Sequence, residues 1–261
     1  MSWCDAWGGL RLSVGTLTII PVGSLPCTTP AVGRWAMLLA PVAALPVGLL
    51  AAAVALLGAL ADLPSLVTAA LVCAALGWGT RAMHWDGLAD TADGLAAGWD
   101  RERALSVMRR GDAGPVAVGV LVLVLVLDVA GLAPVVNRPW GWLLVGFVVV
   151  AARASCSLTC SRHVPAARED GLGAVVAGTV PTMGTVASAV LAAALLVASG
   201  RPVGVPWWLG VGAAGVGFGA VWILVRTCRR VLGGVTGDVM GAGIEVALCG
   251  MVVVMSSGAA G

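Results

Sequence analysis

The sequence predicts an all-α integral membrane protein, a polytopic helical bundle of about seven spans preceded by an amphipathic helix in the membrane interface. Of the 261 residues, 59% are hydrophobic and 11% are charged, whereas soluble domains carry about 25% charged residues. Apolar stretches near the ~20 residues that cross a hydrocarbon core recur along the chain. Because backbone groups in lipid must pair within their own segment, we expect these stretches to be helices. The length favours a single membrane domain, 1–261, without a separate soluble domain.

The N-terminal segment lacks the basic region that precedes the apolar run of a signal peptide. Apolar side chains recur in it at helical spacing instead, at Trp3, Trp7, Leu10, Val14 and Leu17. This pattern is typical of a helix that lies in the membrane interface. The prolines that follow it are expected to end the helix.

Seven spans are expected after this helix, and six is the alternative count because the first is long and the last is short. The predicted spans are 35–60, 64–84, 114–134, 140–161, 181–200, 206–229 and 240–257. With seven spans, 13 of the 15 arginines lie at or near one side, and only Arg138 and Arg201 lie on the other. Positive residues concentrate on the cytoplasmic side, so we expect the N-terminus and the polar loops there.

The segment "HWDGLADTADGL" (84–95) places Asp86, Asp90 and Asp93 at i, i+4 and i+7, on one face of a helix. Three like charges repel one another unless a cation lies among them. Hard divalent ions such as Mg²⁺ bind carboxylate oxygens and share their shell with substrate phosphate. Gly87 and Gly94 are expected to let a large substrate come close. The pattern predicts a metal site; a solvated acidic loop and an aspartate-rich prenyl diphosphate site are the alternatives.

Two polar segments follow this motif on the same predicted side. "DRERALSVMRRGDAG" (100–114) offers Arg101 and Arg109, and arginines bind phosphate groups bidentately. Positive-inside anchoring of the next span explains these arginines equally well. "SRHVPAAREDGLG" (161–173) adds Arg168 and Glu169, together with His163 as a candidate general base. A lone loop histidine is more often simply solvated.

The last polar segment, "RRVLGGVTGDVMGAGIE" (229–245), is glycine-rich and opens a helix. Free N–H groups at a helix start bind anions, which makes Gly237 a candidate phosphate contact and Asp238 a candidate metal ligand. Helix packing is an equally good explanation for the glycines. Asp128 lies inside a predicted span and must find a partner in the bundle, but the sequence names none. The seven cysteines form no CxxC pair and are expected to be buried hydrophobes.

These motifs resemble a known family. "HWDGLADTADGL" closely resembles the signature of cobalamin synthase, the adenosylcobinamide-GDP ribazoletransferase family, whose pattern is His-x-Asp-Gly-x-Ala-Asp-Thr-x-Asp-Gly. The segments "RERALSVMRRGDAGPVAV", "SRHVPAAREDGLGAVVAG" and "RRVLGGVTGDVMGAGIE" are similar to further segments of the family, in the same order. Arg110 or Gly111 stands where the family often has aspartate.

The resemblance implies a Mg²⁺-dependent enzyme of the bacterial cytoplasmic membrane that acts last in cobalamin nucleotide-loop assembly. Such enzymes join adenosylcobinamide-GDP to α-ribazole or its 5′-phosphate, giving adenosylcobalamin or its phosphate and GMP. We expect no nucleic-acid partner, and an oligomer is compatible with the sequence. Catalytic roles are expected for Asp86, Asp90, Asp93 and His163, Mg²⁺ ligation by Asp86, Asp90, Asp93 and Asp238, and substrate contacts by His84, Arg101, Arg109, Arg168, Glu169 and Gly237.

Three other functions compete with this one. CDP-alcohol phosphotransferases carry Asp-Gly-x-x-Ala-Arg, but here Ala89 is followed by Asp90 and the rest of that motif is missing. A UbiA-type prenyltransferase needs a second aspartate-rich loop, and 162–180 has only Glu169 and Asp170. Transporters favour repeats and charges at mid-membrane, whereas the charges here gather on one predicted side.

Overall fold

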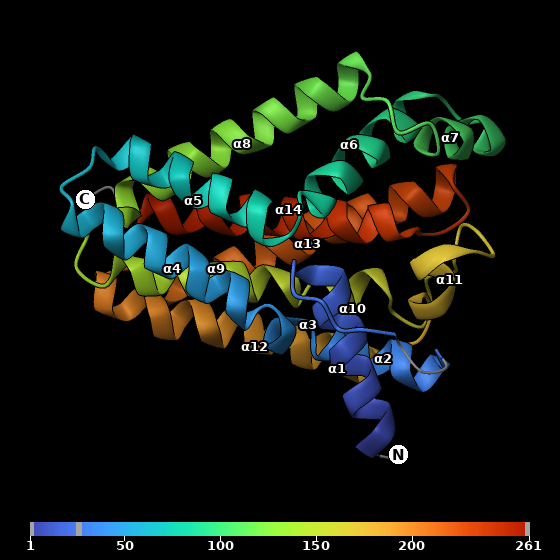
Figure 1. The fold of residues 1–261 in the computed structure, drawn as a ribbon, viewed down its shortest axis with the longest axis horizontal. Coiled ribbons are helices and arrows are strands. Elements are labelled where there is room, and N and C mark those ends of the chain that lie inside the picture. The colour runs from blue at the N-terminus through green and yellow to red at the C-terminus, as the bar shows by residue number, and fades with distance from the viewer. Residues whose placement is uncertain (1–2, 25–27, 259–261) are drawn as a thin grey trace.

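In a computed structural model of the protein, which describes residues 3–24 and 28–258, the regular elements are helices (Figure 1). The expected all-α membrane bundle is confirmed. Its elements are α1 (Trp3–Leu17), α2 (Pro30–Leu38), α3 (Ala40–Ala43), α4 (Leu45–Leu60), α5 (Ser65–Gly79), α6 (Met83–Ala96), α7 (Arg101–Met108), α8 (Pro115–Val136), α9 (Gly141–Arg153), α10 (Cys156–Thr159), α11 (Gly171–Val176), α12 (Thr182–Gly200), the 3-10 turn η1 (Arg201–Val203), α13 (Trp207–Val231) and α14 (Gly237–Ser257).

Within the described residues, five helical segments are long and apolar enough to cross a membrane, and six if α5 and α6 count as one bent span. The five are α8, α9 with α10, α12 with η1, α13 and α14, and they match five of the expected spans. The remaining apolar helix, α4, has only 16 residues. The lengths and compositions of these helices therefore support six membrane spans, the lower of the two expected counts, more directly than seven.

Two predicted spans are wrong as continuous helices. The segment 35–60 is divided into α2, α3 and α4, because Pro41 and Pro46 each lie in the first turn of a new helix, where the missing N–H of proline is tolerated. The segment 64–84 ends at Gly79. Arg81 and Ala82 then adopt positive φ angles of 55° and 56°, and α6 leaves at 89° to α5.

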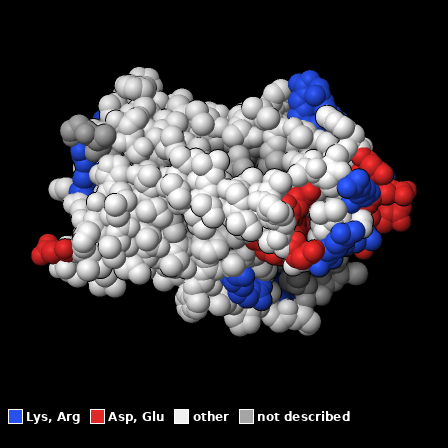
Figure 2. Space-filling model, turned by 90° about the horizontal axis from the view of Figure 1, so that it is seen from above, with Lys and Arg blue, Asp and Glu red and all other residues white. Residues whose placement is uncertain are grey.

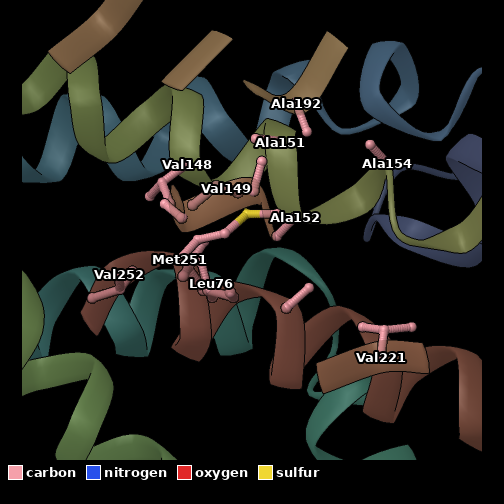
Figure 3. Packing of buried hydrophobic residues seen from close by; sticks show 14 of the residues in the cluster. Leu76, Val148, Val149, Ala151, Ala152, Ala154, Ala192, Val221, Met251 and Val252 are labelled. Atoms are coloured by element: carbon pink, nitrogen blue, oxygen red, sulfur yellow. The ribbon is translucent and has the colours of Figure 1, made fainter. Parts of the chain in front are cut away.

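The core is built around α14, which packs against α6, α8, α9 and α13. Figure 3 shows Met251 of α14 inserted among side chains of neighbouring helices, including Leu76 and Val149. Glycines permit this close packing, because small residues let the backbones of membrane helices approach one another. A Cβ on Gly217 of α13 would lie 2.8 Å from Cε of Met251. The outer helices α8 and α12 have few buried residues, and many of their large apolar side chains are exposed.

Charged residues concentrate at one end of the bundle, where α7 and α11 lie (Figures 1 and 2). We call this the charged end and define it by residues 86–115, 162–173 and 226–238. The helix α1 extends from the bundle across the long axis of the molecule (Figure 1), with Trp3 and Trp7 exposed, as expected of an interfacial helix. Arg153, expected near the charged loops, is instead 1% exposed inside the bundle.

Candidate functional site

A cavity of about 280 Å³ lies between α1, α2, α6, α10, α11 and α14. Asp86, in the first turn of α6, and Asp238, in the first turn of α14, both line it. His84 and Gly237 also line it, and most of the other lining residues are apolar. We call this space the acidic cavity. The structure thus brings together the first and the last of the polar motifs.

Glycines allow the two aspartate-bearing helices to meet at the acidic cavity. A Cβ on Gly87 of α6 would lie 2.6 Å from the carbonyl oxygen of Asp238, and one on Gly241 of α14 would lie 3.2 Å from Cα of His84. A Cβ on Gly94 would lie 2.5 Å from Cγ of Met108 in α7. The expectation that Gly87 and Gly94 admit substrate is therefore wrong, because both glycines contact protein instead.

The start of α14 orients Asp238. The hydroxyl of Thr236, the N-cap residue, accepts a hydrogen bond from the N–H of Val239 and donates one of 3.0 Å to Oδ2 of Asp238. Nη1 of Arg168 lies 4.0 Å from the same oxygen, and Nη2 of Arg168 donates to the carbonyl of Leu105. Asp238 is consequently held by its own helix start and faces a half-buried guanidinium that offsets its charge.

Backbone pairing holds the loop before α14 against the loop that carries Arg168. The N–H of Val235 donates to the carbonyl of Pro165, and the N–H of Ala167 donates to the carbonyl of Val235. A Cβ on Gly234 would overlap the carbonyl of Pro165. Gly234 therefore serves chain packing, the alternative explanation for the glycines of this motif, while Gly237 lines the acidic cavity.

The three aspartates of α6 have different surroundings. Asp90 is partly buried, and the charges of Asp86, Asp238 and Arg168 all act on it. Asp93 accepts hydrogen bonds from the N–H groups of Gly114 and Ala117 at 2.5 and 2.9 Å. Carboxylates are stabilised by free N–H groups at a helix start, so Asp93 caps α8 from a neighbouring helix. Asp86 and Asp90, which have no such hydrogen bonds to a helix start in the described part of the chain, remain available near Asp238 for binding a metal ion or accepting a proton.

The carboxylates around the acidic cavity can supply some, but not all, of the ligands that Mg²⁺ needs. No group of three or more His, Cys, Asp or Glu side chains among the described residues is arranged to hold a metal ion. Magnesium, however, is usually bound by one or two protein carboxylates together with substrate phosphates and waters. Asp86 and Asp238, which line one cavity from two helices, match that smaller set. Asp93 does not line this cavity, and each of its carboxylate oxygens accepts a hydrogen bond from the start of α8.

Four of the other expected site residues lie outside the acidic cavity. Arg101 donates from Nε to the carbonyl of Leu232 and from Nη2 to that of Ala167, so it ties α7 to two loops. Arg109 is exposed and lies 3.8 Å from the exposed Asp170. Glu169 is also exposed. His163 accepts a hydrogen bond from Nε of Arg162 and lines a different cavity.

A buried polar cluster adjoins the acidic cavity. The sequence points to two of its residues, His84 and Asp128, but does not group them. Nδ1 of His84 lies 3.6 Å from Oε1 of Glu245 and 3.4 Å from Nη2 of Arg153. Nη1 of Arg153 donates to the carbonyl of Val149, and the charges of Glu245 and Arg153 act on Asp128. Asp128 is therefore within reach of both charges, but among the described residues its Oδ1 is buried without a hydrogen-bond partner.

The signal for this cluster was present in the sequence. Arg153, Glu245 and Asp128 are ionisable residues inside apolar segments, and such residues usually face the bundle interior. Their common position in the bundle depends on how three helices pack, which residue spacing does not reveal. Among the described residues, Nε2 of His84 and Nε of Arg153 are buried without a hydrogen-bond partner.

The family model for cobalamin-5-phosphate synthase matches residues 9–256 of the chain. An adenosylcobinamide-GDP ribazoletransferase of Nocardioides sp. is 46% identical over 244 residues, which cover 94% of this chain and 95% of the relative. Enzymes of the same name from Frankia casuarinae and Geotalea daltonii are 34% and 39% identical, covering 94% and 93% of this chain and 93% and 95% of the relatives. No solved structure matches the chain.

Proposed function

The chain belongs to the cobalamin-5-phosphate synthase family, and we propose on that premise that it is an adenosylcobinamide-GDP ribazoletransferase. It transfers the adenosylcobinamide-phosphate group of adenosylcobinamide-GDP to α-ribazole or its 5′-phosphate. The products are adenosylcobalamin, or its 5′-phosphate, and GMP. This is the closing step of cobalamin nucleotide-loop assembly.

The observation that carries this proposal is the pairing of Asp86 and Asp238 in one cavity beside Arg168. Two carboxylates and a guanidinium are the groups that a metal-assisted transfer between phosphates needs. The acidic cavity, at about 280 Å³, is smaller than most drug-sized ligand pockets. It can hold the diphosphate, whereas the much larger corrinoid must remain outside it.

The reaction exchanges one phosphorus–oxygen bond for another. A ribose hydroxyl of α-ribazole attacks the phosphorus attached to cobinamide, and the bond from that phosphorus to the GMP oxygen breaks. Asp90, beside Asp86 and Asp238, accepts the hydroxyl proton. Arg168 offsets negative charge on the phosphate oxygens, as guanidiniums do in other phosphoryl transfers.

Asp86 and Asp238 are the residues that would hold Mg²⁺, with the substrate diphosphate completing its shell. When bound, the ion would supply charge stabilisation for the departing GMP. Thr236 keeps the Asp238 carboxylate in one orientation through its hydroxyl. Asp93 supports the site indirectly by fixing the start of α8 against α6.

The same proposal includes the orientation in a bacterial inner membrane. Nine of the 15 arginines lie in the segments that define the charged end, and by the positive-inside rule this end would face the cytoplasm. The acidic cavity would then open toward the compartment that contains nucleotides. A Cys4→Ser/Cys27→Ser/Arg103→Cys variant, which lacks the exposed native thiol of Cys4, would test this with a membrane-impermeant cysteine-reactive label. Labelling of position 103 from inverted vesicles only is expected.

The activity itself is tested with the purified protein in detergent, given labelled adenosylcobinamide-GDP and Mg²⁺. GMP release that requires α-ribazole or its 5′-phosphate, with formation of the corresponding cobalamin, is the expected result. Equal GMP release without α-ribazole would contradict the transferase assignment. Uptake of the corrinoid into vesicles without conversion would favour transport instead.

A further inference from the structure

A second cavity lies on the other side of α10, between the start of α12 and the last turns of α13. Its volume is about 400 Å³. It shares no lining residue with the acidic cavity, so the proposed transfer reaction does not explain it. We call it the basic cavity because its ionisable lining residues are Arg226, Arg229 and His163.

The basic cavity is arranged to receive an anion. Arg226 lies over the ring of Trp222, with 5.3 Å from Cζ to the ring centroid, which fixes its guanidinium at the cavity wall. Neither Arg226 nor Arg229 takes part in an ion pair among the described residues. No carboxylate-bearing residue lines the cavity, and its wall is almost entirely apolar between the residues that carry these polar groups. Two exposed arginines beside a largely apolar cavity fit a ligand that joins a phosphate group to apolar chains.

The remainder of the basic cavity is apolar, and it lies between two helices that are long enough to cross a membrane. Leu158, Val164 and Val225 form part of its wall. Ile223 of α13 and Met183 of α12, each next in sequence to a lining residue, are exposed large hydrophobic side chains on helices long enough to cross a membrane. An occupant that reached these residues would be in contact with lipid, so its apolar part must itself be lipid-like.

We propose that the basic cavity binds an anionic phospholipid, with its phosphate between Arg226 and Arg229 and its first acyl carbons along Leu158 and Val225. The position suits such a ligand, because the arginines lie at the end of α13 that belongs to the charged end and Trp222 lies one turn further into the membrane. Tryptophans and arginines at this depth are typical contacts of lipid headgroups. The bound lipid would join α12 to α13 at their polar ends.

The test is native mass spectrometry of the full chain purified in a maltoside detergent. Dioleoyl phosphatidylglycerol should remain bound at concentrations at which dioleoyl phosphatidylcholine does not. The double variant Arg226→Ala/Arg229→Ala should weaken phosphatidylglycerol binding about ten-fold or more, since charge-assisted hydrogen bonds are lost. Thr182→Trp, at an exposed position, should also weaken it by filling the cavity without changing charge.

The matched control is Arg230→Ala/Arg103→Ala, which removes two exposed arginines of the charged end that do not line the basic cavity. It should retain binding. An equal loss in this control, equal binding of phosphatidylcholine, or unchanged binding by Thr182→Trp would each overturn the proposal. Complete displacement of phosphatidylglycerol by equimolar inorganic phosphate would make the cavity a site for soluble phosphates and would also overturn it.

Discussion

The carbonyl oxygen of Asp238 lies 2.6 Å from the position that a Cβ of Gly87 would occupy. The backbones of α6 and α14 therefore touch at the point where Asp86 and Asp238 enter the acidic cavity. Any side chain at position 87 must push these helices apart. The distance between Asp86 and Asp238 thus depends on position 87 being a glycine, which has no Cβ.

Gly87→Ala is expected to lower turnover about ten-fold or more, because a displacement near 1 Å is enough to misplace catalytic groups. Overpacking should also lower the free energy of unfolding by about 1–3 kcal/mol. Initial rates of GMP release and thermal unfolding in detergent measure the two effects. Gly119→Ala is the control, since a Cβ on this glycine of α8 has no neighbour within 4 Å. Equal behaviour of the two variants would contradict the packing argument.

Replacing Asp93 is expected to lower the stability of the start of α8 more than it lowers the rate of the reaction. Asp93→Ala removes both acceptors at the start of α8, and losing a helix cap costs about 0.5–2 kcal/mol. Hydrogen exchange of the amides of Gly114 and Ala117 should accelerate in this variant. Asp112→Ala, an exposed residue of the same loop, is the control and should leave exchange unchanged. If Asp93→Ala exchanged like wild type but lost all activity, Asp93 would belong to the catalytic set instead.

Much of the fold follows from the sequence because a run of apolar residues can satisfy its backbone in lipid only as a helix. This is why five of the spans, from α8 to α14, lie close to their predicted limits. The breaks were harder to predict. Pro41 and Pro46 divide one predicted span, and the bend at Arg81 and Ala82 arises from a backbone conformation that neither residue type favours.

The candidate site was predictable only as a set of motifs. The i, i+4, i+7 spacing correctly places three aspartates on one helix, yet it could not separate Asp93 from Asp86 and Asp90. The groups that bind Asp93 are 21 and 24 residues further along the chain, and their position depends on how α8 packs. Arg168 likewise reaches Asp238 through loop pairing that no local pattern indicates.

Turnover is expected to require Mg²⁺, to cease on addition of EDTA and to return when Mg²⁺ is restored in excess. Asp86→Asn and Asp238→Asn should each raise the half-saturating Mg²⁺ concentration about ten-fold or more, because even groups outside the first shell of a metal change affinity this much. Glu169→Gln is the control, as Glu169 is exposed near the same end. A shift of the same size in Glu169→Gln, or none in the aspartate variants, would remove Asp86 and Asp238 from the metal site.

The buried cluster of Arg153, His84 and Glu245 is expected to be strongly coupled. Arg153→Met removes the buried arginine whose charge interacts with that of Glu245, and breaking one partner of a buried pair costs about 3–5 kcal/mol. Arg153→Met combined with Glu245→Gln should cost less than the sum of the two single changes, because no lone charge remains. Thermal unfolding of the four proteins in detergent completes the cycle, with Arg110→Met as a control for losing an exposed arginine. Additive losses would mean that the two charges do not interact, and the proximity of Glu245 and Arg153 to His84 would then be packing without electrostatic consequence.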